Sequence, residues 1–143
     1  MSVKDILSQK GPDIYTVPNS AKLREAIAVL NDKNIGVVLI TDQDGKLDGI
    51  LSERDIIRRS LSQETGFRDE SVTKSMTKNV LSVDPAASVD DVMEVMTNSR
   101  IRHVPVLDGE TILGLISIGD VVKRKIAQAE NEAAAMRDYI AAG

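Results

Sequence analysis

Hydrophobic and polar residues follow one another in the same order twice along this chain. In each copy an apolar stripe at the spacing i, i+3, i+4, i+7 predicts one amphipathic helix. The first stripe consists of Leu23, Ala26, Ile27 and Leu30. The second stripe consists of Val89, Val92, Met93 and Met96. Ser20 and Ser88 stand just before the two stripes and are the expected N-caps.

Two short apolar runs follow each stripe, separated by a turn that contains Asp and Gly. The runs cover residues 35–40 and 47–51 in the first copy, and residues 101–107 and 111–116 in the second. Apolar runs on either side of such a turn are typical of a β-hairpin. A further helix is expected directly after each hairpin.

A short strand and a lead-in helix complete each copy. The strands begin at Thr16 and Ser82, and the lead-in helices are expected at residues 3–7 and 72–76. Because one repeat alone has little core, the sequence predicts an α/β (α+β) fold. Two β-α-β-β-α repeats would pack face to face with pseudo-twofold symmetry, followed by a C-terminal helix. The expected parts are the first repeat with its lead-in helix, a linker, the second repeat and the C-terminal helix, at residues 1–62, 63–71, 72–126 and 127–143.

Composition removes several classes of function. The chain has no Cys and one His, which excludes a disulfide framework, a thiol nucleophile and a zinc–thiolate cluster. Two Tyr, one Phe and no Trp predict an aliphatic core and leave no stacking platform for nucleic acid. A net charge of −4 also disfavours a general DNA-binding protein. Since no apolar stretch suits a membrane span or a signal peptide, we expect a cytoplasmic protein without membrane partners.

Beyond the second repeat, apolar residues continue at alternating spacings of four and three. The series is Val122, Ile126, Ala129, Ala133, Met136 and Ile140. Such a heptad seam, with small residues in its middle, predicts a helix that packs closely along one face. Two interpretations remain open: the helix docks on the core of its own chain, or it crosses to a second subunit. We favour the second subunit.

The segments Gly49–Asp55 and Gly114–Asp120 share the pattern Gly-x-x-Ser-x-x-Asp where a strand turns into a helix. In a structural interpretation the Ser is an N-cap and the Asp completes a capping box. In a functional interpretation the free N–H groups of the helix start attract a phosphate, and the carboxylate accepts hydrogen bonds from ribose. Both interpretations can hold together. Gly119 would let a ligand approach the backbone, and Arg54, at the equivalent position of the first copy, could contact phosphate.

Arg102 and His103 interrupt an apolar run of the second copy, where the first copy has Gly36 and Val37. Neighbouring strand residues point to opposite faces, so the two side chains do not line one surface unless the strand end is twisted, and Arg102 fits either a solvated strand edge or a ligand contact. Pro105 lacks an N–H and indicates an edge strand or a locally freed backbone. The two copies therefore differ at these positions.

These features together resemble the CBS (cystathionine β-synthase) domain, which occurs in tandem pairs. The resemblance rests on the two Gly-x-x-Ser-x-x-Asp segments, on Arg102-His103-Val104-Pro105-Val106 and on the lead-in Met76-Thr77, and it spans about Val3 to Ile126. It implies a stand-alone pair that binds AMP, ADP, ATP, S-adenosylmethionine or NAD in the cleft between the two copies. A homodimer is also implied, and no catalytic cofactor or metal is.

In this family the Ser or Thr of the motif contacts phosphate and the Asp holds ribose. The start of the first strand often lines the adenine pocket, and basic strand residues reach the phosphates. The resemblance thus implies unequal sites, with phosphate met mainly by the second copy. The resemblance therefore implies a ligand site at Thr16, Ser52, Arg54, Asp55, Ser82, Arg102, His103, Pro105, Ser117, Gly119 and Asp120.

The favoured function is a regulatory module that senses an adenosine nucleotide and signals to a partner protein through a conformational or dimer change. The alternative is a ligand-independent interaction or dimerisation module with degenerate pockets. An enzyme is not expected, because the sequence has no P-loop, no second His and no clustered carboxylates.

Overall fold

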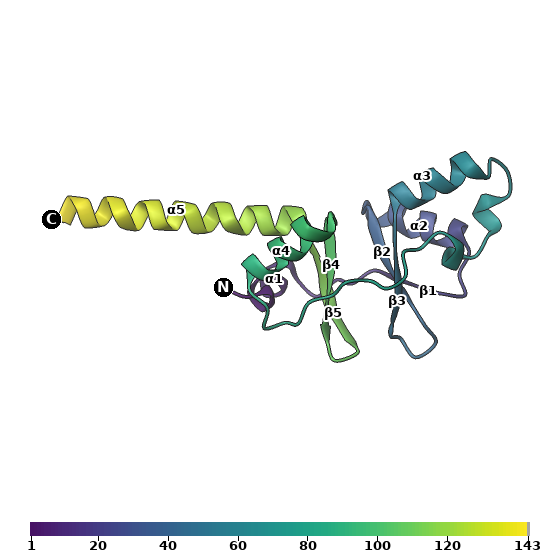
Figure 1. The fold of residues 1–143 in the computed structure, drawn as a ribbon, viewed down its shortest axis with the longest axis horizontal. Coiled ribbons are helices and arrows are strands. Elements are labelled where there is room, and N and C mark those ends of the chain that lie inside the picture. Colours follow the sequence, from purple (N-terminus) through teal and green to yellow (C-terminus); the bar gives the residue numbers. More distant parts are fainter. Residues whose placement is uncertain (143) are drawn as a thin grey trace. The chain divides into compact units, whose positions relative to one another are not determined.

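The computed structural model describes residues 1–142, which form two compact units. The first-repeat unit contains Asp13–Leu81 and the turn region Asp108–Ile112. The second-repeat unit contains Met1–Pro12, Ser82–Leu107 and the chain from Leu113 onward. Figure 1 labels the helices and strands of both units.

The first-repeat unit contains a three-stranded sheet and two α-helices. Its elements are β1 (Thr16–Pro18), α2 (Leu23–Lys33), β2 (Val37–Thr41), β3 (Leu47–Ser52) and α3 (Glu53–Ser62). Strand β2 lies in the middle of the sheet, parallel to β1 and antiparallel to β3. The predicted β-α-β-β-α order is therefore confirmed for the first repeat.

The second repeat keeps the same order but has almost no first strand. Its elements are α4 (Val89–Ser99), β4 (His103–Asp108), β5 (Thr111–Ser117) and α5 (Ile118–Ala142). Strands β4 and β5 form a two-stranded sheet. The strand predicted to begin at Ser82 is reduced to a single parallel bridge between Val83 and Val106.

Pro105 accounts for one of the hydrogen bonds that this strand has lost. In the first repeat the Leu39 N–H donates to the Tyr15 carbonyl over 3.2 Å and ties the start of β1 to β2. Pro105 holds the equivalent position of the second repeat and has no N–H to donate. Within the described residues, Val83 keeps two backbone hydrogen bonds, one donated to the Pro105 carbonyl and one accepted from the Leu107 N–H, both over 3.0 Å. The edge-strand interpretation of Pro105 agrees with this arrangement.

Each unit also contains the lead-in segment that precedes the other repeat. Helix α1 (Val3–Lys10) belongs to the second-repeat unit, where the Val3 N–H donates to the Ala87 carbonyl over 2.9 Å. The 3-10 turn η2 (Val72–Lys74) belongs to the first-repeat unit, where the Val72 N–H donates to the Ala21 carbonyl over 3.0 Å. These two bonds occupy equivalent places in the repeats, so the exchange of lead-in segments is reciprocal.

Each unit has its own aliphatic core, and the exchanged lead-in contributes to it. The first-repeat core consists of Val17, Ala21, Leu23, Ala26, Leu30, Val38, Ile40, Leu51, Val72 and Met76. The second-repeat core consists of Val3, Ile6, Val89, Val92, Met96, Val104, Val106, Ile116 and Val121. The aliphatic core predicted from composition is confirmed, because every residue of both clusters is aliphatic.

The predicted N-cap is confirmed for α4 and wrong for α2. Ser88 caps α4, because its Oγ accepts a hydrogen bond from the Asp91 N–H over 3.0 Å. Helix α2 begins after Lys22 instead of Ser20. The Lys22 N–H donates to Glu25 Oε2 over 2.7 Å, so the acidic side chain one turn into the helix fixes its start.

The helix predicted at residues 72–76 is also wrong, since only the turn η2 forms there. The chain leaves η2 in order to pair with β3. Ile50 and Thr77 form an antiparallel bridge with two backbone hydrogen bonds, of 3.1 and 2.8 Å. This backbone pairing requires extended chain and stops the helix after one turn.

The glycine that opens each Gly-x-x-Ser-x-x-Asp segment lies directly under a lead-in. A Cβ added at Gly49 would lie 2.5 Å from Met76 Sδ and 2.9 Å from the Thr77 carbonyl oxygen. A Cβ added at Gly114 would lie 2.6 Å from Leu7 Cδ2. Both distances are too short for real contacts, but only at Gly49 does the clash include a backbone atom, because at Gly114 the added Cβ would meet the Leu7 side chain alone.

Alanine at the two glycines tests this packing. Gly49→Ala is expected to lower the free energy of unfolding by about 1–3 kcal/mol, because the Thr77 carbonyl belongs to the backbone and cannot move aside. Gly114→Ala should cost less than about 1 kcal/mol, because the Leu7 side chain can change its rotamer. Urea unfolding followed by circular dichroism measures both values. Equal losses for the two variants would contradict the explanation.

Candidate functional site

Several predicted site residues meet at the start of α5. The Ser117 N–H donates to Asp120 Oδ2 over 2.8 Å, and the Asp120 N–H donates to Ser117 Oγ over 3.1 Å. These reciprocal bonds form a capping box, which satisfies backbone donors that the helix itself leaves unpaired. Both residues are half-buried, at the point where β5 passes into the helix.

Ser52 and Asp55 form the same box at the start of α3. Asp55 Oδ2 accepts from the Ser52 N–H over 2.9 Å and from the Ser52 hydroxyl over 3.0 Å, and Ser52 Oγ accepts from the Asp55 N–H over 3.2 Å. The capping interpretation of both motifs is confirmed. Within residues 1–142 both Asp55 and Asp120 accept hydrogen bonds only through Oδ2, which leaves Oδ1 able to meet another donor.

One backbone donor remains at the start of α5. The N–H of Ile118 donates to the Arg102 carbonyl over 2.8 Å, and the N–H of Asp120 is used by the capping box. The N–H of Gly119 has no partner in the described part of the chain, and Gly119 has no side chain to cover it. A ligand oxygen could therefore approach the helix at this point. In the first repeat the equivalent residue is the exposed Arg54.

Lys10, at the end of α1, is a site residue that sequence analysis missed. Its Nζ donates to Asp120 Oδ2 over 2.8 Å and to the Leu115 carbonyl over 2.7 Å. Lys10 lies in the stretch that makes the first lead-in longer than the second, so the repeat offers no counterpart that could have indicated it. The contact joins residues far apart in the sequence and is visible only in the folded unit.

A cavity of about 350 Å³ lies beside this ion pair, between α1 and the first turns of α5. It is lined by Ile6, Gln9, Lys10, Asp120, Lys123, Arg124 and Ala127. Three of the lining side chains are cations and one is an anion, so the cavity carries net positive charge. Its volume lies in the range of small-molecule sites.

The other predicted residues of the second repeat lie at different depths. Arg102 is exposed, and His103 is half-buried at the start of β4, as expected for neighbours that point to opposite faces. Pro105 is buried within β4, and Ser82 is exposed just before the single bridge that replaces the first strand. None of these four residues lines the cavity next to Lys10.

The charges around Asp120 shift two pKa values. Burial raises the pKa of Asp120, but the hydrogen bonds from Lys10 and Ser117 and the charge of Lys10 outweigh it and hold the pKa below its usual 3.8. Burial, the charge of Lys10 and the charge of Arg102 lower the pKa of His103 from its usual 6.5, against the opposing charge of Asp120. At neutral pH Asp120 is thus an anionic acceptor and His103 is neutral.

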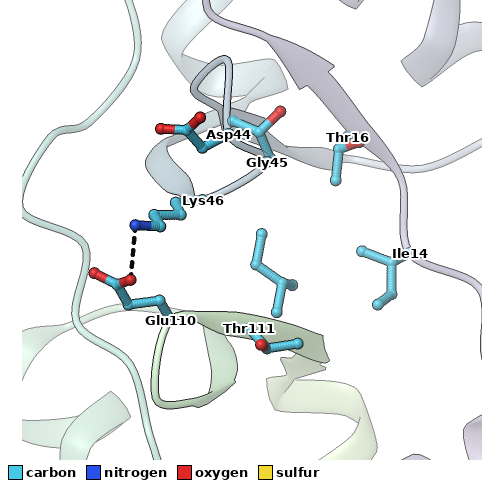
Figure 2. A pocket seen from close by; sticks show the side chains of 9 residues that line it. Ile14, Thr16, Asp44, Gly45, Lys46, Glu110 and Thr111 are labelled. Carbon is cyan, nitrogen blue, oxygen red and sulfur yellow. Dashed lines mark ion pairs between the residues drawn. The ribbon is translucent and has the colours of Figure 1, made fainter.

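A second hollow, of about 600 Å³, lies in the first-repeat unit and contains an ion pair of 2.8 Å between Lys46 and Glu110 (Figure 2). Its lining residues are Ile14, Thr16, Thr41, Asp44, Gly45, Lys46, Glu110, Thr111 and Ile112. The exposed Thr16 is the one predicted site residue among them. Neither Ser52 nor Asp55 lines this hollow, although the sheet register places Thr16 in line with Leu39 and Ile50, two residues before Ser52.

None of the helices in residues 1–142 combines the length and the apolar character needed to cross a membrane. The same residues contain no cluster of three or more His, Asp or Glu side chains that could hold a metal ion.

The half-buried His103 predicts a pH dependence of stability. Its folded-state pKa lies below 6.5, so the neutral form favours folding, and stability is lost as the pH falls below about 6.5. The chain has one His, and carboxyl groups titrate mostly below about pH 5, so the window between about pH 7.5 and 5.5 isolates this group. Urea unfolding should show a small loss over this window in the wild type and none in His103→Gln. An equal loss in the variant would assign the effect elsewhere.

Comparison with known proteins identifies the repeat. The family model described as CBS domain matches residues 3–62 and 70–126. The mitochondrial CBS domain-containing protein CBSX3 of Arabidopsis thaliana is 30% identical over 150 residues, which cover 99% of this chain and 73% of that protein. The crystal structure of the CBS-domain containing protein ATU1752 from Agrobacterium tumefaciens has a TM-score of 0.82 and 42% identity, covering 87% of this chain and 92% of that one.

A third similar structure holds ligands. It is the CBS domain pair of protein MJ0100 in complex with 5′-methylthioadenosine and S-adenosyl-L-methionine, with a TM-score of 0.78 and 29% identity. The similarity covers 90% of this chain and 98% of that chain. The repeat, the order of elements and these matches agree, and this chain belongs to the CBS domain family as a tandem pair of its repeats.

Proposed function

We propose that this chain is a regulatory module that binds a phosphate-bearing adenosine ligand at its second repeat. CBS pairs are regulatory modules, and the related pair of MJ0100 holds two adenosine compounds. The observation that carries the proposal is the arrangement at Asp120. This ionised carboxylate caps α5 through Oδ2 and keeps Oδ1 unbonded within residues 1–142, next to a cationic cavity.

The carboxylate is suited to a ribose. Each carboxylate oxygen can accept more than one hydrogen bond, so Asp120 Oδ1 can meet the two neighbouring ribose hydroxyls. The unpaired Gly119 N–H offers a donor beside it for a ligand oxygen. Capping and ribose binding then use different oxygens of Asp120. The protein can keep its helix cap while it holds the ligand.

The basic residues supply partners for phosphate. Lys10, Lys123 and Arg124 line the cavity that contains Asp120, and Arg102 is exposed just before β4. Charge-assisted hydrogen bonds from such groups to phosphate oxygens are roughly twice as strong as neutral ones. Lys10 would exchange part of its bonding to Asp120 for a phosphate oxygen. A phosphate-bearing ligand therefore suits this repeat better than a neutral nucleoside.

The backbone near Ser82 is the proposed place of the adenine ring. Because Pro105 removes a ladder bond, the chain before Val83 is held by less backbone pairing than the equivalent stretch of β1. Backbone groups there are free to meet the polar edge of a base. The protein has few aromatic residues, so the ring would lie between aliphatic side chains.

The first repeat is a weaker candidate for phosphate. Glu53 stands where the second repeat has Ile118, and Gly36 stands where it has the cationic Arg102. A carboxylate at the first turn of α3 repels a phosphate at that helix start. The inequality of the two sites, and the cleft expected from the resemblance, stay predictions that ligand binding can test.

The charge of each adenosine ligand predicts its relative affinity for this site. AMP, ADP, ATP and NAD are anions, whereas the sulfonium of S-adenosylmethionine adds a positive charge near the ribose. Next to three cationic side chains the anions are favoured. Binding would act by favouring one conformation or dimer arrangement that a partner protein recognises.

Isothermal titration calorimetry with these ligands, and with 5′-methylthioadenosine, tests the proposal. We expect a dissociation constant of roughly micromolar order for at least one phosphate-bearing adenosine ligand. Affinity should fall as salt is added, because the phosphate contacts are ionic. Stronger binding of S-adenosylmethionine than of AMP would contradict the assignment of phosphate to this repeat. Absence of heat with every ligand would contradict ligand binding altogether.

A matched pair of variants separates the cap from the ligand contact. Asp120→Ala and Asp55→Ala each remove a capping-box acid, so each should lower the free energy of unfolding by about 0.5–2 kcal/mol. Only Asp120→Ala should weaken nucleotide binding, by about tenfold or more, because a charged hydrogen-bond acceptor for ribose is lost. If Asp120→Ala destabilises the protein and leaves the affinity unchanged, the residue is a cap alone.

A ligand-independent interaction module remains the second candidate. The observation that favours it is the bond between Lys10 and Asp120, which already occupies one oxygen of the proposed ribose acceptor. Lys10→Met distinguishes the two functions. In the nucleotide-binding module this variant should weaken binding of AMP more than binding of 5′-methylthioadenosine, which lacks phosphate. In the interaction module neither compound binds to either protein.

A further inference from the structure

Helix α5 exposes an apolar stripe over most of its length. Val122, Ile126, Met136 and Ile140 are 50%, 55%, 60% and 68% exposed, whereas the adjacent Val121 is 2% exposed and belongs to the second-repeat core. Figure 1 shows the C-terminal half of α5 running clear of the other elements of its unit. Docking of this stripe on the chain's own core, one of the two interpretations left open by the sequence, is therefore wrong.

We propose that the stripe binds the same stripe of a second copy of this chain, through an antiparallel pair of α5 helices. The stripe consists of the heptad residues Val122, Ile126, Ala129, Ala133, Met136 and Ile140. The twofold axis passes near the midpoint between Ala127 and Gln128. Ile140 lies beyond the paired layers, because its counterpart about this axis, Leu115, belongs to β5. Such a pair uses one patch on both copies, as the interface of a twofold dimer must.

Side-chain size selects this register. About the midpoint, Val122 faces Ala133 of the second copy, and Ile126 faces Ala129 of the second copy. Each layer combines one large and one small side chain, so all layers have similar volume. Two helices that keep a constant distance need layers of similar volume, because protein interfaces are close-packed.

The next layer follows the same rule, because Met136 faces Gly119 of the second copy. A parallel, in-register pair would set every residue against itself. Ile126 would then meet Ile126 and Ala129 would meet Ala129, so that wide and narrow layers alternate. The antiparallel pair avoids these gaps and also opposes the two helix dipoles.

The charges beside the stripe support the same register. Lys123 and Glu130 flank it on one side, and Lys125 and Glu132 flank it on the other. About the midpoint each lysine faces the glutamate on its own side of the second copy. A shift by one heptad would instead bring Glu130 against Glu130 and Glu132 against Glu132. Charges at an interface rim select register in this way more than they add affinity.

Lys123 distinguishes the antiparallel from the parallel arrangement. Lys125 already pairs with Asp90 of its own chain over 2.6 Å, whereas Lys123 is exposed and makes no ion pair within residues 1–142. In the antiparallel pair Lys123 gains an acidic partner. In a parallel pair it gains none, and Arg137 takes its place by pairing with Glu132. An effect of substituting Lys123 therefore indicates the antiparallel pair, and an effect of substituting Arg137 indicates the parallel pair.

Engineered cysteines test the arrangement directly, since the natural chain has none. Full-length Val122→Cys and Ala133→Cys variants, one of them carrying a mass tag, are mixed and oxidised. The antiparallel pair should give a mixed disulfide between them, because the two positions face each other. In a parallel pair they lie about 16 Å apart along the helix, beyond the ~7 Å that a disulfide spans. Formation of the two homodisulfides alone would overturn the proposal.

A matched charge reversal gives a second measurement without crosslinking. Sedimentation equilibrium of the wild-type chain should show a concentration-dependent dimer. Lys123→Glu should raise the dimer dissociation constant by roughly threefold or more, because two symmetric ion pairs become repulsive. Arg137→Glu should leave it unchanged within about twofold, and circular dichroism checks that both variants keep their helix. The reverse order of effects, or a monomer at every concentration, would overturn the proposal. Neither experiment depends on a ligand.

Discussion

The packing of a lead-in segment on a strand glycine is the contact on which each unit depends. Leu7 lies over Gly114 and Met76 lies over Gly49, at distances that a side chain on the strand could share only if the lead-in or its side chain moved. These contacts let the exchanged lead-ins add residues to two cores that are otherwise small. The same contact fixes the direction of α1. Because α1 is held there, Lys10 at its end reaches Asp120.

Asp120 consequently serves several partners within a few ångströms. Its Oδ2 accepts hydrogen bonds from the Ser117 N–H and from Lys10. Burial raises the pKa of Asp120, but these bonds and the charge of Lys10 lower it further, so the carboxylate stays ionised. A helix start with a satisfied cap can remain rigid while a ligand approaches the remaining oxygen. The helix cap uses Asp120 Oδ2 and the proposed ribose contact uses Oδ1, so the two do not compete for one oxygen. The competition concerns Lys10, whose Nζ would bond both Asp120 and a phosphate.

Features encoded by local spacing could be predicted from the sequence. The two amphipathic stripes, the hairpins and the Ser-x-x-Asp boxes depend on residues within a few positions of one another. Features that arise between distant residues could not. Part of the loss of the strand at Ser82 follows from Pro105 across the sheet, and the bond between Lys10 and Asp120 joins opposite ends of the chain. The end of η2 likewise depends on pairing of Thr77 with β3.

Gly119 connects the two proposals. Its unpaired N–H is offered to a ligand, and its missing side chain makes room for Met136 of a second copy. Both contacts involve Gly119 in the first turn of α5. A ligand at the helix start and a partner helix along its side would therefore both restrict the motion of the same few residues. Two binding events that restrict one segment are linked, and the linkage is reciprocal: a ligand that strengthens the dimer is itself bound more tightly by the dimer. The first turn of α5 is therefore the place where nucleotide binding could be converted into a change of assembly.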